Sequence, residues 1–262
     1  MSVDTQTLDE AAVSHYLKKH LDGFEGPMDV TKFQTGQSNP TFMLKTPSHN
    51  YVLRRKPPGV LLKSAHAVDR EFRVQKALAG TDMPVSKMHL LCEDDSIIGS
   101  MFYIMDHVPG RNFNEPSMEG LTPVHRTGVI DDMNRVLAAL HEVDITAIGL
   151  SDFGPEGNYF ERQVGRWSKQ YRASVTQKIP EMDELMIRLV EERPEDDGQR
   201  TLVHGDYRLD NMIFDATDTQ VRAVLDWELS TLGDPLADFT YVAMAWVTQN
   251  EGRSGVMDLD RA

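Results

Sequence analysis

The chain has 262 residues and is 40% hydrophobic, which is enough to bury a core in one large domain or two smaller lobes. Acidic residues outnumber basic ones by 41 to 27, and the net charge of −14 argues against a nucleic-acid-binding protein, which needs a basic face. Cys92 is the single cysteine, so the chain has neither an intrachain disulfide nor a cysteine-based zinc site.

Membrane and secretory signals are missing from the sequence. No apolar run approaches the roughly 18 residues that a membrane-spanning helix needs. The first residues also lack the charged and apolar pattern of a signal peptide. We therefore expect a cytoplasmic protein that does not contact a membrane.

The first part of the chain predicts a small sheet accompanied by helices. A capping-box pattern from Thr7 to Glu10 predicts the start of a first helix, which Gly23 ends. A second helical pattern covers residues 65–78 and stops at Gly80. Short β-rich runs, separated by turn residues, predict antiparallel strands at 30–33, 41–45, 51–55, 88–92 and 101–105.

The second part of the chain is mainly helical. A polar segment at 106–111 separates it from the sheet and reads as a linker. Beyond this linker, helices are predicted at 131–143, 160–172, 182–192 and 235–247. We therefore predict an α+β fold with an N-terminal lobe at 1–105, a linker at 106–111 and a C-terminal lobe at 112–262.

Residues 204–211, HGDYRLDN, have the spacing of a kinase catalytic loop. In such a loop the Asp accepts the proton of an attacking hydroxyl group and the Asn binds a magnesium ion. This spacing predicts Asp206 as the catalytic base and Asn211 as a metal ligand.

The residues after this loop predict a β-hairpin with a polar group at each end. Asn211 precedes the apolar run 212–214, a turn-rich segment follows, and the second run, 221–225, ends at Asp226. Folding the hairpin brings Asn211 and Asp226 together. Amide and carboxylate oxygens suit Mg²⁺ that bridges phosphate groups.

Other polar residues nearby have simpler interpretations. We predict that His204 holds the loop by hydrogen bonds, that Asp210 is a turn carboxylate and that Asp234 is a helix N-cap. Asp238 is predicted to be buried and to accept hydrogen bonds from the loop backbone. Two roles stay open for Arg208, namely a solvated cation and a catalytic residue that stabilises charge on the transferred phosphoryl group.

In the first lobe, Val52 and Arg54 share one face of a predicted strand because side chains alternate. Kinases place a phosphate-binding Lys here and pair it with a Glu on the next helix, so Glu71 is the predicted partner of Arg54. Val52 is expected over the adenine. An exposed strand with solvated arginines is the alternative.

Two further segments are candidates for nucleotide contacts. Residues 35–39 lie between two predicted strands and read either as a phosphate-covering loop or as an ordinary hairpin turn. Residues 105–108 lie at the lobe junction, where backbone groups can reach the adenine. The candidate cofactor-binding residues in these segments are Gly36, Gln37, Ser38, Asn39, Asp106 and Val108.

These motifs resemble the aminoglycoside phosphotransferase family, a branch of the kinase-like fold that includes choline kinases. The similarity rests on HGDYRLDN, on LDWELSTLGDPLAD from residue 225 and on YVLRRKPPG from residue 51. The subfamily that matches best is related to the kinase-like segment of acyl-CoA dehydrogenase fusion proteins. The resemblance implies ATP and Mg²⁺, with Asp206 as the base, Asn211 and Asp226 as metal ligands and Glu71 as the helix glutamate.

The chain departs from this family's pattern in two places. Arg54 stands where most of the fold has Lys, and these two cations are not interchangeable because Arg offers a planar, bidentate fork. The sequence also ends at Ala262, where family members usually continue with helices that help form the acceptor site. We therefore expect the C-terminal lobe to be incomplete.

The resulting hypothesis is a kinase that transfers the γ-phosphoryl group of ATP to the hydroxyl group of a small molecule. A hydroxyacyl thioester is one candidate acceptor and an aminoglycoside is a weaker one. A non-catalytic nucleotide-binding pseudokinase is the alternative that Arg54 motivates. A metal-dependent phosphoesterase built on His204, Asp206 and Asp226 would need further histidine ligands at spacings that the sequence lacks.

Overall fold

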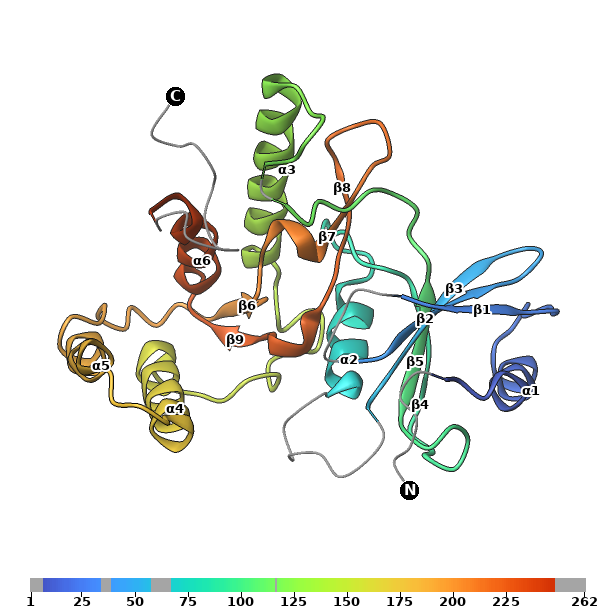
Figure 1. Cartoon of the computed structure of the whole chain (residues 1–262), viewed down its shortest axis with the longest axis horizontal. Coiled ribbons are helices and arrows are strands. Elements are labelled where there is room, and N and C mark those ends of the chain that lie inside the picture. The colour runs from blue at the N-terminus through green and yellow to red at the C-terminus, as the bar shows by residue number, and fades with distance from the viewer. Residues whose placement is uncertain (1–6, 34–38, 58–66, 116, 248–262) are drawn as a thin grey trace.

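The computed structural model describes residues 7–33, 39–57, 67–115 and 117–247. The ribbon has two parts, a sheet with helices α1 and α2 and a mainly helical part that contains α3 to α6 (Figure 1). This is the α+β, two-lobed architecture that the sequence predicts.

The sheet of the first part is five-stranded and antiparallel, with the order β1-β2-β3-β5-β4. Each predicted strand is confirmed, with ends that differ by at most one residue. Alternating burial along β2 and the β-rich composition explain why these short runs pair. The strands are β1 (Asp29–Lys32), β2 (Thr41–Lys45), β3 (Asn50–Arg55), β4 (Met88–Cys92) and β5 (Phe102–Asp106).

Helices α1 (Glu10–His20) and α2 (Val68–Leu78) cover opposite faces of this sheet (Figure 1). Leu53 packs into the core beneath α1, whereas Val52 packs with Val68 of α2, because neighbouring strand residues point to opposite faces. The predicted capping box is wrong in one detail. Asp9, not Thr7, is the N-cap of α1, and its Oδ1 accepts a hydrogen bond from the Ala12 N–H at 2.9 Å.

The second part combines helices with two small two-stranded sheets. The predicted hairpin is confirmed, whereas the sequence interpretation missed the pairing of the short strands β6 and β9. The elements are α3 (Pro123–His141), α4 (Tyr159–Ser174), α5 (Pro180–Glu191), β6 (Thr201–Val203), η1 (Leu209–Asn211), β7 (Met212–Phe214), β8 (Val221–Val224), η2 (Trp227–Leu229), β9 (Thr231–Gly233) and α6 (Leu236–Val247).

Helix α3 begins at Pro123, well before the predicted start at residue 131. Thr122 is its N-cap and accepts a hydrogen bond from the His125 N–H at 3.3 Å, while Pro123 occupies the first turn, where its missing N–H costs nothing. The prediction relied on the spacing of apolar residues alone. The first turn is exposed and has no apolar residue that faces the core. The buried side of α3 includes Val129 and Leu140.

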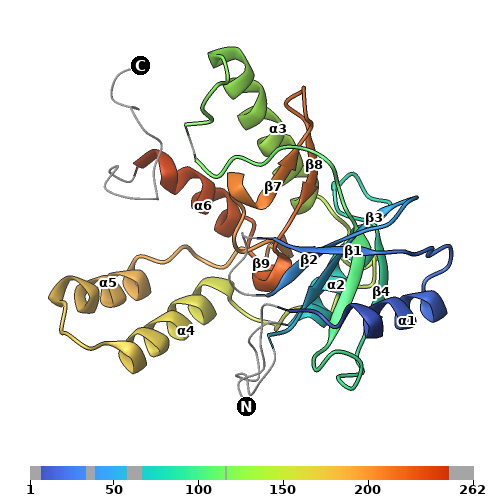
Figure 2. The ribbon, with the colours of Figure 1, turned by 45° about the vertical axis from the view of Figure 1, so that its right-hand side comes forward.

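Helices α4 and α5 lie side by side and project away from the sheet in both views (Figure 1, Figure 2). Helix α4 has no fully buried residue, and on α5 Met186 is buried while Ile187 and Val190 are exposed. Within the described ranges, no helix is both long and apolar enough to cross a membrane.

Contacts of α2 and of the linker help to fix the position of the first part on the second. From α2, Arg70 Nη2 donates hydrogen bonds to the carbonyl oxygens of Phe153 at 2.7 Å and Ser230 at 3.3 Å. In the linker, Arg111 exchanges two backbone hydrogen bonds with Phe214 of β7, at 2.9 and 2.8 Å. These contacts bring β3 and α2 to the loop that follows β6.

Candidate active site

The loop after β6 is held by a buried carboxylate from α6. Asp238 is 0% exposed, and its two oxygens accept hydrogen bonds from the His204 N–H at 2.7 Å and the Gly205 N–H at 2.8 Å. The predicted role of Asp238 is therefore confirmed. Two backbone donors on one carboxylate leave the loop little freedom to move.

Gly205 has a φ of +84° in this loop. A Cβ atom here would lie 2.9 Å from the carbonyl oxygen of Leu229, so any side chain would strain the backbone and collide with η2. The glycine before Asp206 thus allows the loop to pass close to η2.

The His204 side chain is buried and ties the loop to the hairpin. Its Nε2 donates to the Leu225 carbonyl at 2.9 Å, and its Nδ1 accepts from the Asp206 N–H at 3.2 Å. Burial lowers the pKa of His204, against the opposing effect of Asp238. The ring is therefore neutral and holds the loop by hydrogen bonds, as the sequence predicts.

Asp206 and Asn211 meet at the head of this loop. Asn211 Nδ2 donates to the Asp206 side-chain oxygen Oδ2 and to the Asp206 carbonyl oxygen, both at 2.9 Å. This double contact fixes the carboxylate, and the sequence spacing alone could not show it. Asp206 is partly exposed, so a small molecule can reach it.

Asp226 follows β8, so it comes to the same open end of the hairpin as Asn211, which precedes β7. The Leu225 N–H donates to the Asn211 carbonyl at 2.8 Å, which closes the hairpin next to both side chains. Asp226 has left-handed backbone angles, φ 63° and ψ 56°. A non-glycine residue in this region is uncommon and is often found at functional sites, where the surrounding structure holds it.

Arg54 of β3 crosses from the first lobe to this hairpin. Its Nε lies 3.0 Å from Glu71 Oε2, which confirms the predicted pair, and its Nη2 forms an ion pair with Asp226. The same nitrogen lies 4.0 Å from Glu228 Oε2. The predicted Arg54 pairing therefore extends to a second carboxylate group on the other lobe.

Glu71 is completely buried on α2 and has three partners. Besides Arg54, Asn39 Nδ2 donates to its Oε1 at 2.9 Å and the Tyr103 hydroxyl donates to its Oε2 at 3.0 Å. Burial raises the pKa of Glu71, although Arg54 acts in the opposite direction. Burial also disfavours the charge of Arg54, but Glu71 and Asp226 hold its pKa above the ordinary value.

The oxygen atoms around Arg54 suit a hard cation. One oxygen from each of Glu71, Asp226 and Glu228 lies within 4.8 Å of the others, and Asn211 adds an amide beside Asp226. Mg²⁺ prefers such oxygen ligands. The donor set therefore fits the Mg²⁺ that the resemblance implies, and Glu228 is a neighbour that the sequence interpretation missed. Asn211 and Asp226 as metal ligands stay a prediction.

Arg208 is paired in this structure. Its Nε donates to Asp210 Oδ1 at 2.5 Å, and this hydrogen-bonded carboxylate raises its pKa, against the effect of burial. Arg208 thus forms a local ion pair with Asp210 of the η1 turn while its side chain stays 49% exposed, so both predicted roles of Arg208 stay open. Its predicted role in stabilising the phosphoryl group stays a prediction.

The residues predicted to contact a nucleotide do not all lie on the Arg54 side of the sheet. Val52 lies on the Arg54 side of the sheet, as expected. Asn39 is buried, and its amide donates to the carboxylates of Glu71 and Glu228. Its side chain therefore holds these two carboxylates and does not extend over them. The other predicted members of that loop, Gly36, Gln37 and Ser38, lie outside the described residues.

The side chain of Asp106 lies on the side of the hinge away from Arg54. Its side chain accepts from His49 and His89 on the face of the sheet that α1 covers, because Asp106 pairs with Tyr51 of that face. It therefore points away from Val52 and Arg54. Nucleotide contacts through the hinge backbone, including Val108, stay a prediction.

Tyr241 is a further residue that the sequence interpretation missed. It lies one turn after Asp238 on α6. Burial and a hydrogen bond to the Asp206 carboxylate raise its pKa, and it also contacts Arg208. Tyr241 follows Asp238, the carboxylate that holds the loop, by three positions, and residues three apart on a helix are neighbours. Helical spacing could therefore have indicated Tyr241 from the sequence.

Comparisons with known proteins agree with this geometry. The profile of a phosphotransferase enzyme family (APH) matches residues 29–261. The chain belongs to this family. Its likeness to acyl-CoA dehydrogenase family member 10 of Mus musculus is 48% identity over 243 residues, which are 92% of this chain and 23% of that protein. This phosphotransferase-family chain thus spans about a quarter of that relative's length.

Solved structures show the same fold. A crystal structure of a protein from Ralstonia eutropha JMP134, assigned provisionally as an aminoglycoside phosphotransferase, is 51% identical, with a TM-score of 0.85 over 97% of this chain and 75% of that chain. The streptomycin–ATP complex of APH(2")-IIa has a TM-score of 0.64 at 19% identity, over 94% of this chain and 79% of that chain. The kinase-like fold and the resemblance stated from the motifs are confirmed.

Proposed function

We propose that this phosphotransferase-family chain is an ATP- and Mg²⁺-dependent kinase whose acceptor is the hydroxyl group of a small molecule. The observation that carries the proposal is the hydrogen bond from Asn211 to the Asp206 carboxylate, at the end of the hairpin where Asp226 forms its ion pair with Arg54. A proton acceptor, oxygen ligands and a cation thus meet at one place, as phosphoryl transfer requires.

In the proposed reaction, Asp206 accepts the proton of the acceptor hydroxyl while that oxygen forms a bond to the γ-phosphorus. The bond between this phosphorus and the bridging oxygen of ADP breaks, and ADP leaves. Arg54 would contact the phosphate groups, and Asn211 and Asp226 would hold Mg²⁺. When bound, Mg²⁺ neutralises charge on the phosphate oxygens. Asp238 and His204 keep the loop in the conformation in which Asp206 faces the acceptor.

Substitution of Asp206 by Asn tests the proton-transfer step. Asn keeps the size of the side chain but cannot accept the proton, so turnover should fall by about 10²–10⁴-fold while the affinity for ATP changes little. Phosphoryl transfer and ATP binding are measured on the same preparations. Asp183→Asn on the exposed helix α5 is the matched control. Turnover equal to that of the parent would remove Asp206 from the mechanism.

Two kinds of acceptor follow from the similar proteins. The relatives named as acyl-CoA dehydrogenase family members support a hydroxyacyl thioester, and the neighbour crystallised with streptomycin and ATP supports an aminoglycoside as the weaker candidate. Incubation of the chain with Mg-ATP and either a hydroxyacyl-CoA or streptomycin, followed by mass spectrometry, separates them. A gain of one phosphoryl group on the thioester alone supports the first choice.

A non-catalytic nucleotide-binding role is the second candidate, because Arg54 forms an ion pair with Asp226, the predicted metal ligand. In that reading Arg54 takes the place of Mg²⁺ beside the carboxylates. ATP affinity that is unchanged by removal of Mg²⁺, together with no transfer to any acceptor, would favour this role over the kinase.

A further inference from the structure

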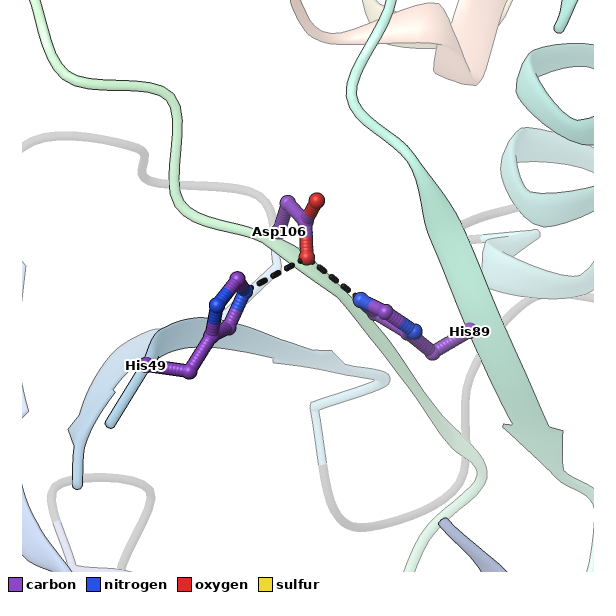
Figure 3. Close-up of side chains that lie close together, drawn as sticks. All are labelled: His49, His89 and Asp106. Atoms are coloured by element: carbon purple, nitrogen blue, oxygen red, sulfur yellow. Dashed lines mark hydrogen bonds and ion pairs between the residues drawn. The ribbon is translucent and has the colours of Figure 1, made fainter. Parts of the chain in front are cut away.

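A second group of metal-ligating side chains lies on the other face of the sheet, away from Asp206. His49 belongs to the turn between β2 and β3, His89 to β4, and Asp106 to the end of β5 (Figure 3). The Nε2 atoms of His49 and His89 lie 2.8 and 2.5 Å from the same oxygen, Asp106 Oδ1. The proposed kinase reaction uses none of these side chains.

The backbone directs His89 toward this group by an irregularity in the sheet. Met88 pairs with Met105 and Leu90 pairs with Ile104, so His89 is an extra residue in β4. An extra residue of this kind is a β-bulge, which changes the direction of a side chain and is common near functional sites. In Figure 3 the His89 ring faces the Asp106 carboxylate from the neighbouring strand.

The other side of the group is equally fixed before any ligand binds. The turn that carries His49 is closed by Thr46, whose N–H and hydroxyl donate to the His49 carbonyl at 2.9 and 2.7 Å. Tyr51 packs against both imidazole rings, with ring centroids 4.4 Å from His49 and 5.4 Å from His89. Fixed rings reduce the conformational entropy that binding an ion would cost.

The chemistry of this group selects a class of ion. Its two imidazole nitrogens and one carboxylate oxygen all lie within 4.8 Å of one another. Imidazole together with carboxylate suits Zn²⁺ and similar transition metals, whereas Mg²⁺ and Ca²⁺ prefer oxygen ligands alone. The side chain of His49 is 43% exposed and that of Asp106 is 26% exposed, so an ion can enter and water can complete its coordination.

We propose that His49, His89 and Asp106 form a binding site for a divalent transition-metal ion of the Zn²⁺ class at the back of the hinge. Each ring then carries its proton on Nδ1 and offers the Nε2 lone pair to the ion. The bound ion links the β2–β3 turn, β4 and the end of β5. It stabilises this junction by binding the folded chain and not the unfolded one.

Calorimetric titration of the full chain with Zn²⁺ in excess Mg²⁺ tests the proposal, because Mg²⁺ competes at the carboxylates around Arg54. We expect one Zn²⁺ per chain. His49→Gln, His89→Gln and Asp106→Asn should each weaken binding by at least about 10–100-fold, the loss typical even for residues that only support a metal ligand. His15→Gln, at an exposed position on α1, should bind Zn²⁺ as the parent does.

Visible absorption of Co²⁺ bound to the chain provides a second readout that reports nitrogen ligands directly. We expect its bands to disappear in the double variant His49→Gln/His89→Gln, whose folding is checked by circular dichroism. Because His49 is exposed, His49→Gln is the single variant least at risk of misfolding. Equal Zn²⁺ affinity in the parent and the double variant would overturn the proposal, as would the lack of one-to-one binding by the parent.

Discussion

At the residue scale, Arg54 joins the two lobes through acidic partners on both sides. Glu71 lies on α2, Asp226 lies on the hairpin, and Arg54 is 9% exposed. Removing one member of a buried ion pair is costly because the other charge is left without a partner. Arg55 points to the opposite face, where its Nη2 donates to the Thr7 carbonyl at 3.0 Å and its guanidinium lies over Phe42.

We expect Arg54→Ala to weaken ATP binding and to lower stability by about 3–5 kcal/mol, the usual cost of breaking a buried pair. Arg54→Lys should keep part of the ATP affinity and part of the stability, since the charge survives without the bidentate fork. Arg55→Ala should affect stability but not ATP affinity. Dissociation constants for Mg-ATP and urea unfolding separate the two effects. A larger loss of ATP affinity in Arg55→Ala than in Arg54→Ala would contradict this assignment.

His204 makes the stability of the chain depend on pH. Burial lowers the pKa of its ring below the ordinary 6.5, so the unfolded state binds a proton at a higher pH than the folded state. Its contribution to stability is therefore present above about pH 6.5 and is lost as the pH falls below that value. Burial raises the pKa of Glu71, so that residue acts in the opposite sense, losing its contribution as the pH rises.

We expect the free energy of unfolding to fall between pH 7 and pH 5.5 less steeply in His204→Gln than in the parent, because Gln does not titrate. The contribution of His204 is at most about 1.4 kcal/mol per pH unit. Urea unfolding at a series of pH values measures both slopes, and the difference between them isolates His204 from Glu71. Identical slopes would show that His204 has the same pKa in both states.

At the element scale, α6 acts on the catalytic loop through Asp238. Removing this carboxylate leaves the buried His204 N–H and the partly buried Gly205 N–H without their acceptor, and each unsatisfied buried group costs about 1–3 kcal/mol. The Cβ of Gly205 would collide with η2, so the loop has few alternative paths that could restore these bonds. Loop geometry and helix position are therefore coupled.

We expect Asp238→Ala to lower stability by several kcal/mol, on the order of the sum for two such groups. Turnover should fall further than ATP affinity, because Asp206 loses its position. Asp238→Asn keeps one acceptor oxygen and should recover part of the loss. Thermal unfolding and steady-state kinetics measure these effects, with Asp183→Ala as the surface control. An equal fall in ATP affinity and turnover would indicate general unfolding instead.

At the scale of the whole molecule, α2 is the helix that docks the sheet on the second lobe. Arg70 donates to carbonyl groups of Phe153 and Ser230, and its guanidinium lies 4.1 Å from the centre of the Phe153 ring. Glu71 is the next residue on the same helix, so the docking contact also sets the position of the Arg54 partner. Docking of α2 on the second lobe and the position of the Arg54 pair are therefore coupled.

We expect Arg70→Ala to weaken ATP binding without a direct contact to the nucleotide, since α2 would shift relative to the hairpin. Arg126→Ala, at an exposed position in the first turn of α3, is the matched control and should bind ATP normally. Nucleotide titration and thermal unfolding are measured for both variants. Normal ATP affinity in Arg70→Ala would show that α2 keeps its place without this contact.

The local features of the chain were predictable from its sequence. Short β-rich or apolar runs bounded by turn residues identified the strands of the first lobe and the hairpin, because composition and turn residues are local properties. The spacing of His204, Asp206 and Asn211 identified the loop, and the alternation of Val52 and Arg54 identified the pair with Glu71.

The tertiary structure alone decided which of these features meet. The β6–β9 pair joins three-residue strands that have too few residues for a detectable pattern. Asp106 faces His49 and His89 rather than the nucleotide side, and Glu228 and Tyr241 join the site. These contacts depend on a bulge, on strand register and on lobe docking. All three are set by packing between segments distant in the sequence, which local periodicity does not record.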